Sequence, residues 1–141
     1  MSYMFRDCKS LINLDLTNFN TIKVTTMSNM FNNCFSLKSI DLSYWNTTNI
    51  KYIDNMFKGC ASLYSIDLSN FETDNLKNIK NIFYSCPELS YIDISSFYSA
   101  DLDYSYLFDE NIHSSGKIRI KNNIYDYIIN YIPSNWTIIW D

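Results

Sequence analysis

The sequence predicts an α/β repeat protein, in which copies of one unit stack into a solenoid. Two observations lead to this prediction. The four cysteines lie at positions 8, 34, 60 and 86, so one occurs every 26 residues of the 141-residue chain. Each copy also begins with an apolar pair, at Met4-Phe5, Met30-Phe31, Met56-Phe57 and Ile82-Phe83. Self-similarity at a fixed period of roughly 20–50 residues is the signature of stacked repeats.

Within each unit, alternating apolar residues predict a short strand. In the second copy Leu37, Ile40 and Leu42 are apolar at positions i, i+3 and i+5, which is the leucine-rich-repeat pattern. Successive side chains of a strand point to opposite faces. We therefore expect Ile40 and Leu42 to face the core, and Asp41 to face outward from a parallel, concave sheet.

The second half of the unit predicts a short helix. Ile50, Ile53, Phe57 and Cys60 recur at the three- to four-residue spacing of one helical face. We therefore expect short helices on the convex side, opposite the strands. One unit alone buries too little apolar surface to offset the entropy of ordering it, so several must stack. The four repeats occupy residues 1–107.

Residues 108–141 predict a capping segment in the order strand, helix, strand. Adding 26 to Ile92 gives Ile118, so the run KIRIK continues the ladder of strands and places Arg119 beside Asp93. The run NIYDYIINYI predicts a helix, and TIIW predicts a final edge strand. Such a segment shields one end of a repeat stack. The first coil has no comparable cap and is a candidate contact with a partner.

The run MFNNCFSLKSIDLSYWNTTNI resembles the BspA-type leucine-rich repeats, in the surface-protein subfamily with the pattern MFxxCxSLxxLDLSxF. The resemblance covers residues 4 to about 105. It implies a right-handed solenoid with a parallel sheet on one side. Proteins that resemble this family are mostly bacterial or protist surface and adhesion proteins.

Charge and hydropathy restrict the function classes. The net charge of −4 argues against direct nucleic-acid binding, which needs clustered Lys and Arg. No apolar stretch approaches the roughly 18 residues of a membrane span, and no secretory leader is visible. We therefore expect a cytoplasmic protein, or a cell-surface or secreted one if a leader has been removed. The stretch from Asn81 to Gly116 is acidic, which indicates a solvated face or a landing site for a basic partner.

One aspartate per unit predicts a row of carboxylates on the sheet, at Asp15, Asp41, Asp67 and Asp93. Neighbouring strands lie about 4.8 Å apart, so these charges repel unless they are compensated. We expect Arg119 to pair with Asp93. Three interpretations of the row remain: hydrogen bonding to nearby Ser, Thr and backbone groups, attraction of a Lys- and Arg-rich partner, and a divalent-cation site, which a linear row surrounds poorly.

The cysteines follow the apolar spacing, which indicates core packing as four reduced thiols. We expect no disulfide, because coils are usually more widely spaced on the convex side than along the strands.

One histidine and no CxxC motif argue against zinc. That histidine, His113, lies in the polar run ENIHSSG and predicts a surface loop. The sequence contains no nucleophile paired with a base and no glycine-rich phosphate loop, so we predict no enzyme, no cofactor and no metal.

Exposed tyrosines beside acidic residues are typical of binding surfaces, although tyrosines can also simply cover the convex side. The predicted partner-binding residues combine both kinds: Asp41, Asp67, Asp93, Tyr91, Tyr64, Glu88, Asp101, Asp103 and Arg119. Asn46-Thr47-Thr48 and Asn135-Trp136-Thr137 match the glycosylation acceptor pattern, a weak signal in a chain rich in Asn.

Three functional hypotheses follow. The first is a non-catalytic repeat module that recognises a protein partner with a basic surface through this acidic, tyrosine-containing face. The second is a small phage-type inhibitor (anti-CRISPR or anti-defence) that presents carboxylates where phosphates would bind. The third is a fragment of a surface adhesin.

Overall fold

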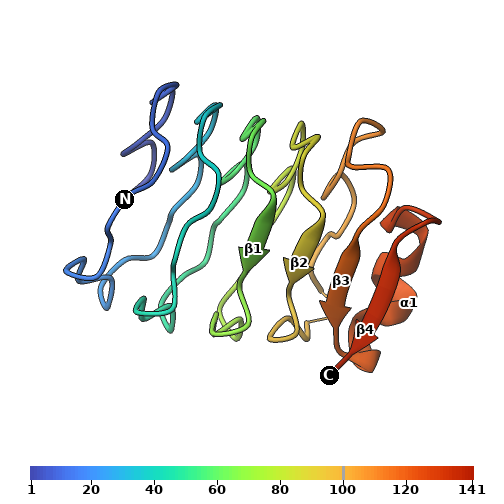
Figure 1. Cartoon of the computed structure of the whole chain (residues 1–141). Coiled ribbons are helices and arrows are strands. Elements are labelled where there is room, and N and C mark those ends of the chain that lie inside the picture. Colours follow the sequence, from blue (N-terminus) through green and yellow to red (C-terminus); the bar gives the residue numbers. More distant parts are fainter. Residues whose placement is uncertain (100) are drawn as a thin grey trace.

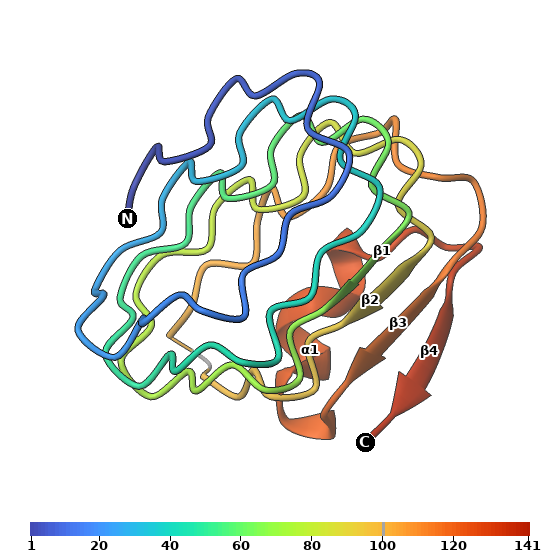
Figure 2. The ribbon, with the colours of Figure 1, turned by 60° about the vertical axis from the view of Figure 1, so that its left-hand side comes forward.

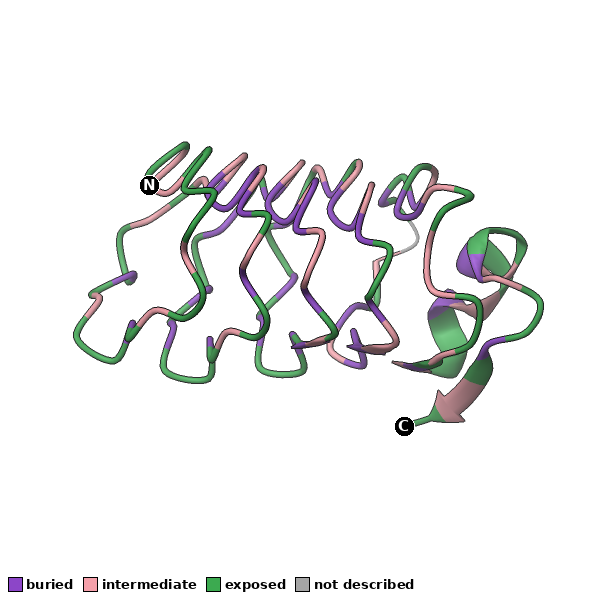
Figure 3. Ribbon diagram, turned by 45° about the horizontal axis from the view of Figure 1, so that its top comes forward, coloured by how far each residue is buried: buried purple, intermediate pink, exposed green. Residues whose placement is uncertain are grey.

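The computed structural model describes residues 1–99 and 101–141. Successive coils of similar shape lie side by side, with the strands along one side of the stack (Figure 1). Viewed more nearly along the stack, the coils nest one behind another (Figure 2). Most apolar residues of the coils after the first are buried inside the stack (Figure 3).

The strands form one parallel sheet in the order β1-β2-β3-β4. They are β1 (Ser65–Asp67), β2 (Tyr91–Asp93), β3 (Lys117–Ile120) and β4 (Thr137–Trp140). Ile66 pairs with Ile92, and Ile92 with Ile118, which are steps of 26 residues. The predicted strand KIRIK and the final edge strand TIIW are therefore confirmed.

The first two repeats contribute no strand to this sheet. Their strand segments are joined by backbone hydrogen bonds from the Lys38 N–H to the Ile12 carbonyl (3.3 Å) and from the Tyr64 N–H to the Lys38 carbonyl (3.2 Å). These bonds hold adjacent coils together without forming a regular ladder. The architecture is thus a repeat-like α/β fold with a four-stranded parallel sheet and little helix.

The segments opposite the sheet form turns, so the prediction of short helices there is wrong. The Met30 N–H donates to the Met27 carbonyl (3.1 Å), and the Cys34 N–H to the Phe31 carbonyl (3.1 Å). Consecutive turns of this kind place apolar side chains inside at three-residue intervals. The sequence pattern of such turns therefore resembles one face of a helix.

Hydrogen bonds between coils explain why these segments are not helical. The Phe31 N–H donates to the Met56 carbonyl of the next coil (2.9 Å), and the Asn33 N–H donates to the Lys58 carbonyl (2.8 Å). An α-helix would use these N–H groups within its own segment. On this side of the molecule the stack is therefore held by backbone bonds between coils.

Two positions in each of these turn segments adopt the left-handed backbone conformation. The first is the asparagine column, with φ values of 60° at Asn29, 55° at Asn55 and 56° at Asn81. The second contains Asn33 (φ 61°) and Gly59 (φ 75°). Asn and Gly adopt this conformation at lower cost than most residues, and Tyr3, Tyr106, Asp7 and Ser85 adopt it at the same positions of other coils.

A file of stacked aromatic rings runs through the core. Ring centroids are 5.4 Å apart for Phe5 and Phe31, 5.5 Å for Phe31 and Phe57, and 6.3 Å for Phe57 and Phe83. Phe108 continues the file at 6.1 Å from Phe83, although it follows Phe83 by 25 residues instead of 26. The turn side therefore continues into a fifth coil that has lost one residue.

The cysteines form a second file beside these rings, and all four are free thiols. The Cys60 thiol donates to the Phe31 carbonyl of the preceding coil (3.2 Å), and Cys34 and Cys86 make the equivalent bonds (3.1 Å each). The expectation of wider coil spacing on this side is wrong, because the inter-coil backbone bonds hold the coils close together. Cys8 belongs to the first coil and is exposed.

The C-terminal segment follows the predicted order of strand, helix and strand. Its helical part is divided into η1 (Asn122–Ile124), α1 (Tyr125–Ile128) and η2 (Ile129–Tyr131). Ile124, Ile128 and Ile132 are buried in the core. At the other end of the stack, Phe5, Leu11 and Phe19 are only partly buried, whereas their counterparts in the following coils are fully buried.

Candidate binding face

The outward positions of the strands form two rows. Asp67, Asp93 and Arg119 are register partners in one row. Ser65, Tyr91, Lys117 and Thr137 are register partners in the other. In the sequence, Asp15 and Asp41 occupy the repeat position of Asp67. The sheet face therefore has acidic residues in the earlier coils and cationic residues on β3.

Each aspartate of the row is bound by its own turn. Oδ1 accepts a hydrogen bond from the N–H two residues later: Thr17 at 3.0 Å, Ser43 at 2.9 Å, Ser69 at 2.9 Å and Ser95 at 3.0 Å. The backbone and hydroxyl of Thr17 lower the pKa of Asp15, and the hydroxyl and backbone of Ser43 lower that of Asp41. The structural interpretation of the row is confirmed, and these two carboxylates are held in their charged form.

The carboxylates of the first three coils are also accessible. Asp15, Asp41 and Asp67 are exposed. Among the residues that the structure describes, neither Asp41 nor Asp67 forms an ion pair. These acids therefore combine a fixed position with uncompensated charge.

Asp93 is different because it is 5% exposed and lies beside a cation. Its Oδ2 is 3.4 Å from Nε of Arg119, which confirms the predicted pair. Tyr91 contributes a long hydrogen bond from its hydroxyl to the same oxygen (3.5 Å). Burial, and then the neighbouring charge of Asp93, raise the pKa of Tyr91.

The remaining predicted residues divide into two groups. Tyr64 immediately precedes β1 and is 52% exposed, so its ring is accessible at the start of the strand. Asp103 instead pairs with Lys80 (2.9 Å), which lies just beyond the bridge segment formed by Thr26, Tyr52 and Asn78. Bonds from the Ser105 hydroxyl and from Lys80 lower the pKa of Asp103 to about 2. Asp101 and Glu88 are exposed and lie outside the strands.

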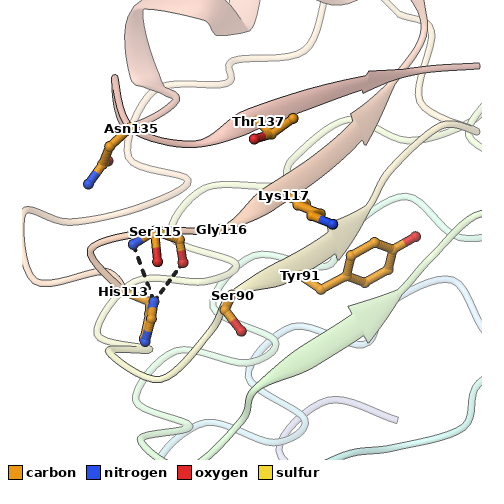
Figure 4. A pocket seen from close by; sticks show the side chains of 8 residues that line it. All are labelled: Ser90, Tyr91, His113, Ser115, Gly116, Lys117, Asn135 and Thr137. Atoms are coloured by element: carbon orange, nitrogen blue, oxygen red, sulfur yellow. Dashed lines mark hydrogen bonds between the residues drawn. The ribbon is translucent and has the colours of Figure 1, made fainter.

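A depression of about 450 Å³ lies where β2, β3 and β4 begin (Figure 4). It is lined by eight residues: Ser90, Tyr91, His113, Ser115, Gly116, Lys117, Asn135 and Thr137. Tyr91, Lys117 and Thr137 are register partners from three adjacent strands. The depression therefore continues the second row of the sheet face.

Packing beneath Gly116 shapes this depression. A Cβ atom at Gly116 would lie 2.6 Å from the Trp136 ring, so any larger residue would displace that ring. The Trp136 indole N–H donates to the His113 carbonyl (2.9 Å), and His113 Nδ1 lies 2.6 Å from the Ser115 carbonyl. The Ser115 N–H also lies 3.3 Å from the same Nδ1, so the two contacts require opposite tautomers of the imidazole. The loop from 113 to 116 is thus held against the C-terminal segment.

Of these eight residues, the sequence predicted only Tyr91 as part of a binding surface. It placed His113 in a surface loop and used Lys117 only as part of a strand. Gly116 is the sequence feature that could have indicated the depression. It occupies the repeat position of Lys38, Tyr64 and Ser90, where the earlier repeats have larger side chains.

The described residues include no group of three His, Cys, Asp or Glu side chains placed to hold a metal ion. No helix in the described part of the chain is both long and apolar enough to cross a membrane.

The fold and the face define a repeat protein with a parallel sheet and one polar, outward-facing surface. The chain belongs to the family described as "Mycoplasma protein of unknown function, DUF285", whose model matches residues 1–120. No curated protein and no solved structure matched the chain.

Proposed function

We propose that the chain is a right-handed leucine-rich-repeat solenoid of the BspA-like surface type, which binds a protein partner through its sheet face and has no catalytic activity. The family supports the general class, because its membership points to a surface-type repeat protein. On this proposal the protein acts at the cell surface, and the adhesin hypothesis is favoured over the inhibitor hypothesis.

The observation that carries this proposal is the repeated exposure of Asp15, Asp41 and Asp67. Each carboxylate is fixed by its own turn, so ordering it upon binding costs little side-chain entropy. Carboxylates at the same position of successive coils repel one another, and a basic partner relieves that repulsion. Tyr64 adds an exposed aromatic ring beside the row, which is typical of residues that dominate binding energy.

Selection of short random peptides displayed on phage tests this proposal without knowledge of the natural partner. The immobilised protein should select peptides rich in Lys and Arg. The double variant Asp41→Asn, Asp67→Asn should bind these peptides at least about tenfold more weakly, because two charge contacts are lost. Binding should also weaken as salt is added.

The matched control is the double variant Glu72→Gln, Asp74→Asn, which removes two exposed acids that lie outside the strands. It should retain wild-type affinity for the same peptides. Equal losses in the two double variants would show that the peptides respond to overall charge, and the sheet face would then not be the binding surface.

A further inference from the structure

The depression beside β3 is a cationic site on an acidic protein. None of its eight lining residues is acidic, and they include Lys117 and His113 together with the hydroxyls of two serines and a threonine. Within the described residues, Lys117 forms no ion pair. An ammonium group surrounded by neutral hydrogen-bond donors is suited to an anion.

The surrounding charge selects the kind of anion. Asp109 and Glu110 line a neighbouring depression that shares His113 and Asn135 with this one. Within the described residues, neither of these acids forms an ion pair. A phosphate carries nearly two negative charges at neutral pH and is repelled more strongly than a carboxylate, which carries one. The site therefore fits a carboxylate better than a phosphate.

We propose that this depression binds a carboxylate of the protein partner, so that the partner lies across the sheet with its cations over the aspartate row and its carboxylate beside Lys117. This inference rests on the proposed function, because it extends the same sheet face. On this proposal the sheet face carries negative charge along the aspartate row and positive charge at Lys117. The partner can therefore bind in only one orientation.

The strand geometry fixes the spacing that the partner requires. Lys117 lies two strands from Asp67 and two residues from it along the strand direction. Two inter-strand steps of about 4.8 Å and two rises of about 3.3 Å give a separation of about 12 Å. An extended peptide spans that distance in three or four residues. The partner should therefore carry an acid three or four residues from its nearest lysine or arginine.

Two synthetic peptides test the inference. Their sequences are KSKSSSE and KSKSSSQ, with both ends blocked. They differ only in the side-chain carboxylate of the last residue. We would titrate each into isotope-labelled full-length protein and follow the backbone amide signals by NMR. The Glu peptide should bind about fivefold or more tightly than the Gln peptide and should shift the signals of Gly116 and Thr137.

Variants locate the effect. Lys117→Gln should remove the difference between the two peptides, whereas Lys77→Gln, which changes an exposed lysine outside the sheet, should preserve it. If both peptides bind the wild-type protein equally, the carboxylate site is wrong and the proposed function stands.

Sodium acetate and sodium phosphate separate the remaining outcomes. If neither peptide binds but acetate shifts Gly116 and Thr137 only when Lys117 is present, the carboxylate site is supported and the basic partner is contradicted. A stronger Lys117-dependent response to phosphate than to acetate would overturn the choice of carboxylate. If no peptide and neither anion shifts these signals, both proposals fail.

Discussion

Nε of Arg119 lies 3.4 Å from Oδ2 of Asp93, and the two residues are register partners on β3 and β2. The contact joins the last repeat strand to the C-terminal segment. Asp93 is nearly buried, and its carboxylate also accepts hydrogen bonds from the N–H (3.0 Å) and hydroxyl (2.6 Å) of Ser95.

Replacing Arg119 by Gln should lower the free energy of unfolding by about 1–2 kcal/mol, because it leaves a buried carboxylate without its cation and Arg119 itself is partly exposed. Urea denaturation checks this value. Lys80→Gln breaks an ion pair between two exposed side chains and should have a clearly smaller effect. An equal or larger effect of Lys80→Gln would contradict a special role for the Asp93 pair.

Gly59, which lies in one of the turn segments, should tolerate substitution poorly. Its φ of +75° disfavours any side chain, and a Cβ atom would lie 2.5 Å from Oδ1 of Asn33 in the preceding coil. Gly59→Ala should destabilise the protein by about 1–2 kcal/mol. Asn55→Gly keeps the left-handed backbone accessible but loses the hydrogen bond that Asn55 Oδ1 accepts from Asn81 Nδ2 (3.2 Å), so it should destabilise the protein less than Gly59→Ala. Thermal denaturation of the two variants compares them, and the reverse order would argue against the left-handed turns.

Thiol reactivity should distinguish the first coil from the others. Cys8 is exposed, whereas Cys34, Cys60 and Cys86 are buried and donate to carbonyls of preceding coils. Ellman's reagent at mildly alkaline pH should therefore modify one thiol quickly in the native protein and all four after denaturation. Rapid modification of several thiols in the native protein would contradict the stacked file.

The same thiols predict how stability depends on alkaline pH. Burial raises the pKa of Cys34 from 9.0 to about 11 and that of Cys86 to about 12. The folded state therefore favours the neutral thiols, whose stabilising effect is complete below pH 9 and is lost as the pH rises through 11 and 12. Burial of Tyr104 acts in the same direction.

Denaturant titrations between pH 8 and 12 would measure this loss. The double variant Cys34→Ala, Cys86→Ala is less stable at neutral pH because it leaves cavities, but its stability should fall less steeply above pH 9. An unchanged slope in the variant would show that these two thiols do not cause the loss.

The sequence was sufficient to predict the features that depend on the repeat register. The pairing of Ile92 with Ile118, and hence that of Asp93 with Arg119, follows from adding one period. It also follows that the cysteines lie in a file, because identical residues of successive coils occupy identical places.

The features that could not be predicted depend on backbone bonds between coils. The spacing of Ile53, Phe57 and Cys60 suits a helix as well as a series of turns, and the ladder between coils decides in favour of turns. The depression could not be predicted either, because it depends on a contact that the repeat pattern does not contain. It is formed by Trp136 packing beneath Gly116, a contact between two loops that lies outside the repeat pattern.

The central claim is that the sheet face, and not the turn side, binds the partner. Photo-crosslinking from two exposed tyrosines tests it most directly: Tyr64, just before β1 and 52% exposed, and Tyr106, at the repeat position of the turn residue Asn81 and 62% exposed. In each of two variants, a photoreactive phenylalanine derivative replaces one of these tyrosines. Each variant is then irradiated in the presence of the selected basic peptides. We predict a crosslinked product from position 64 and none from position 106, and crosslinking only from position 106 would contradict the account.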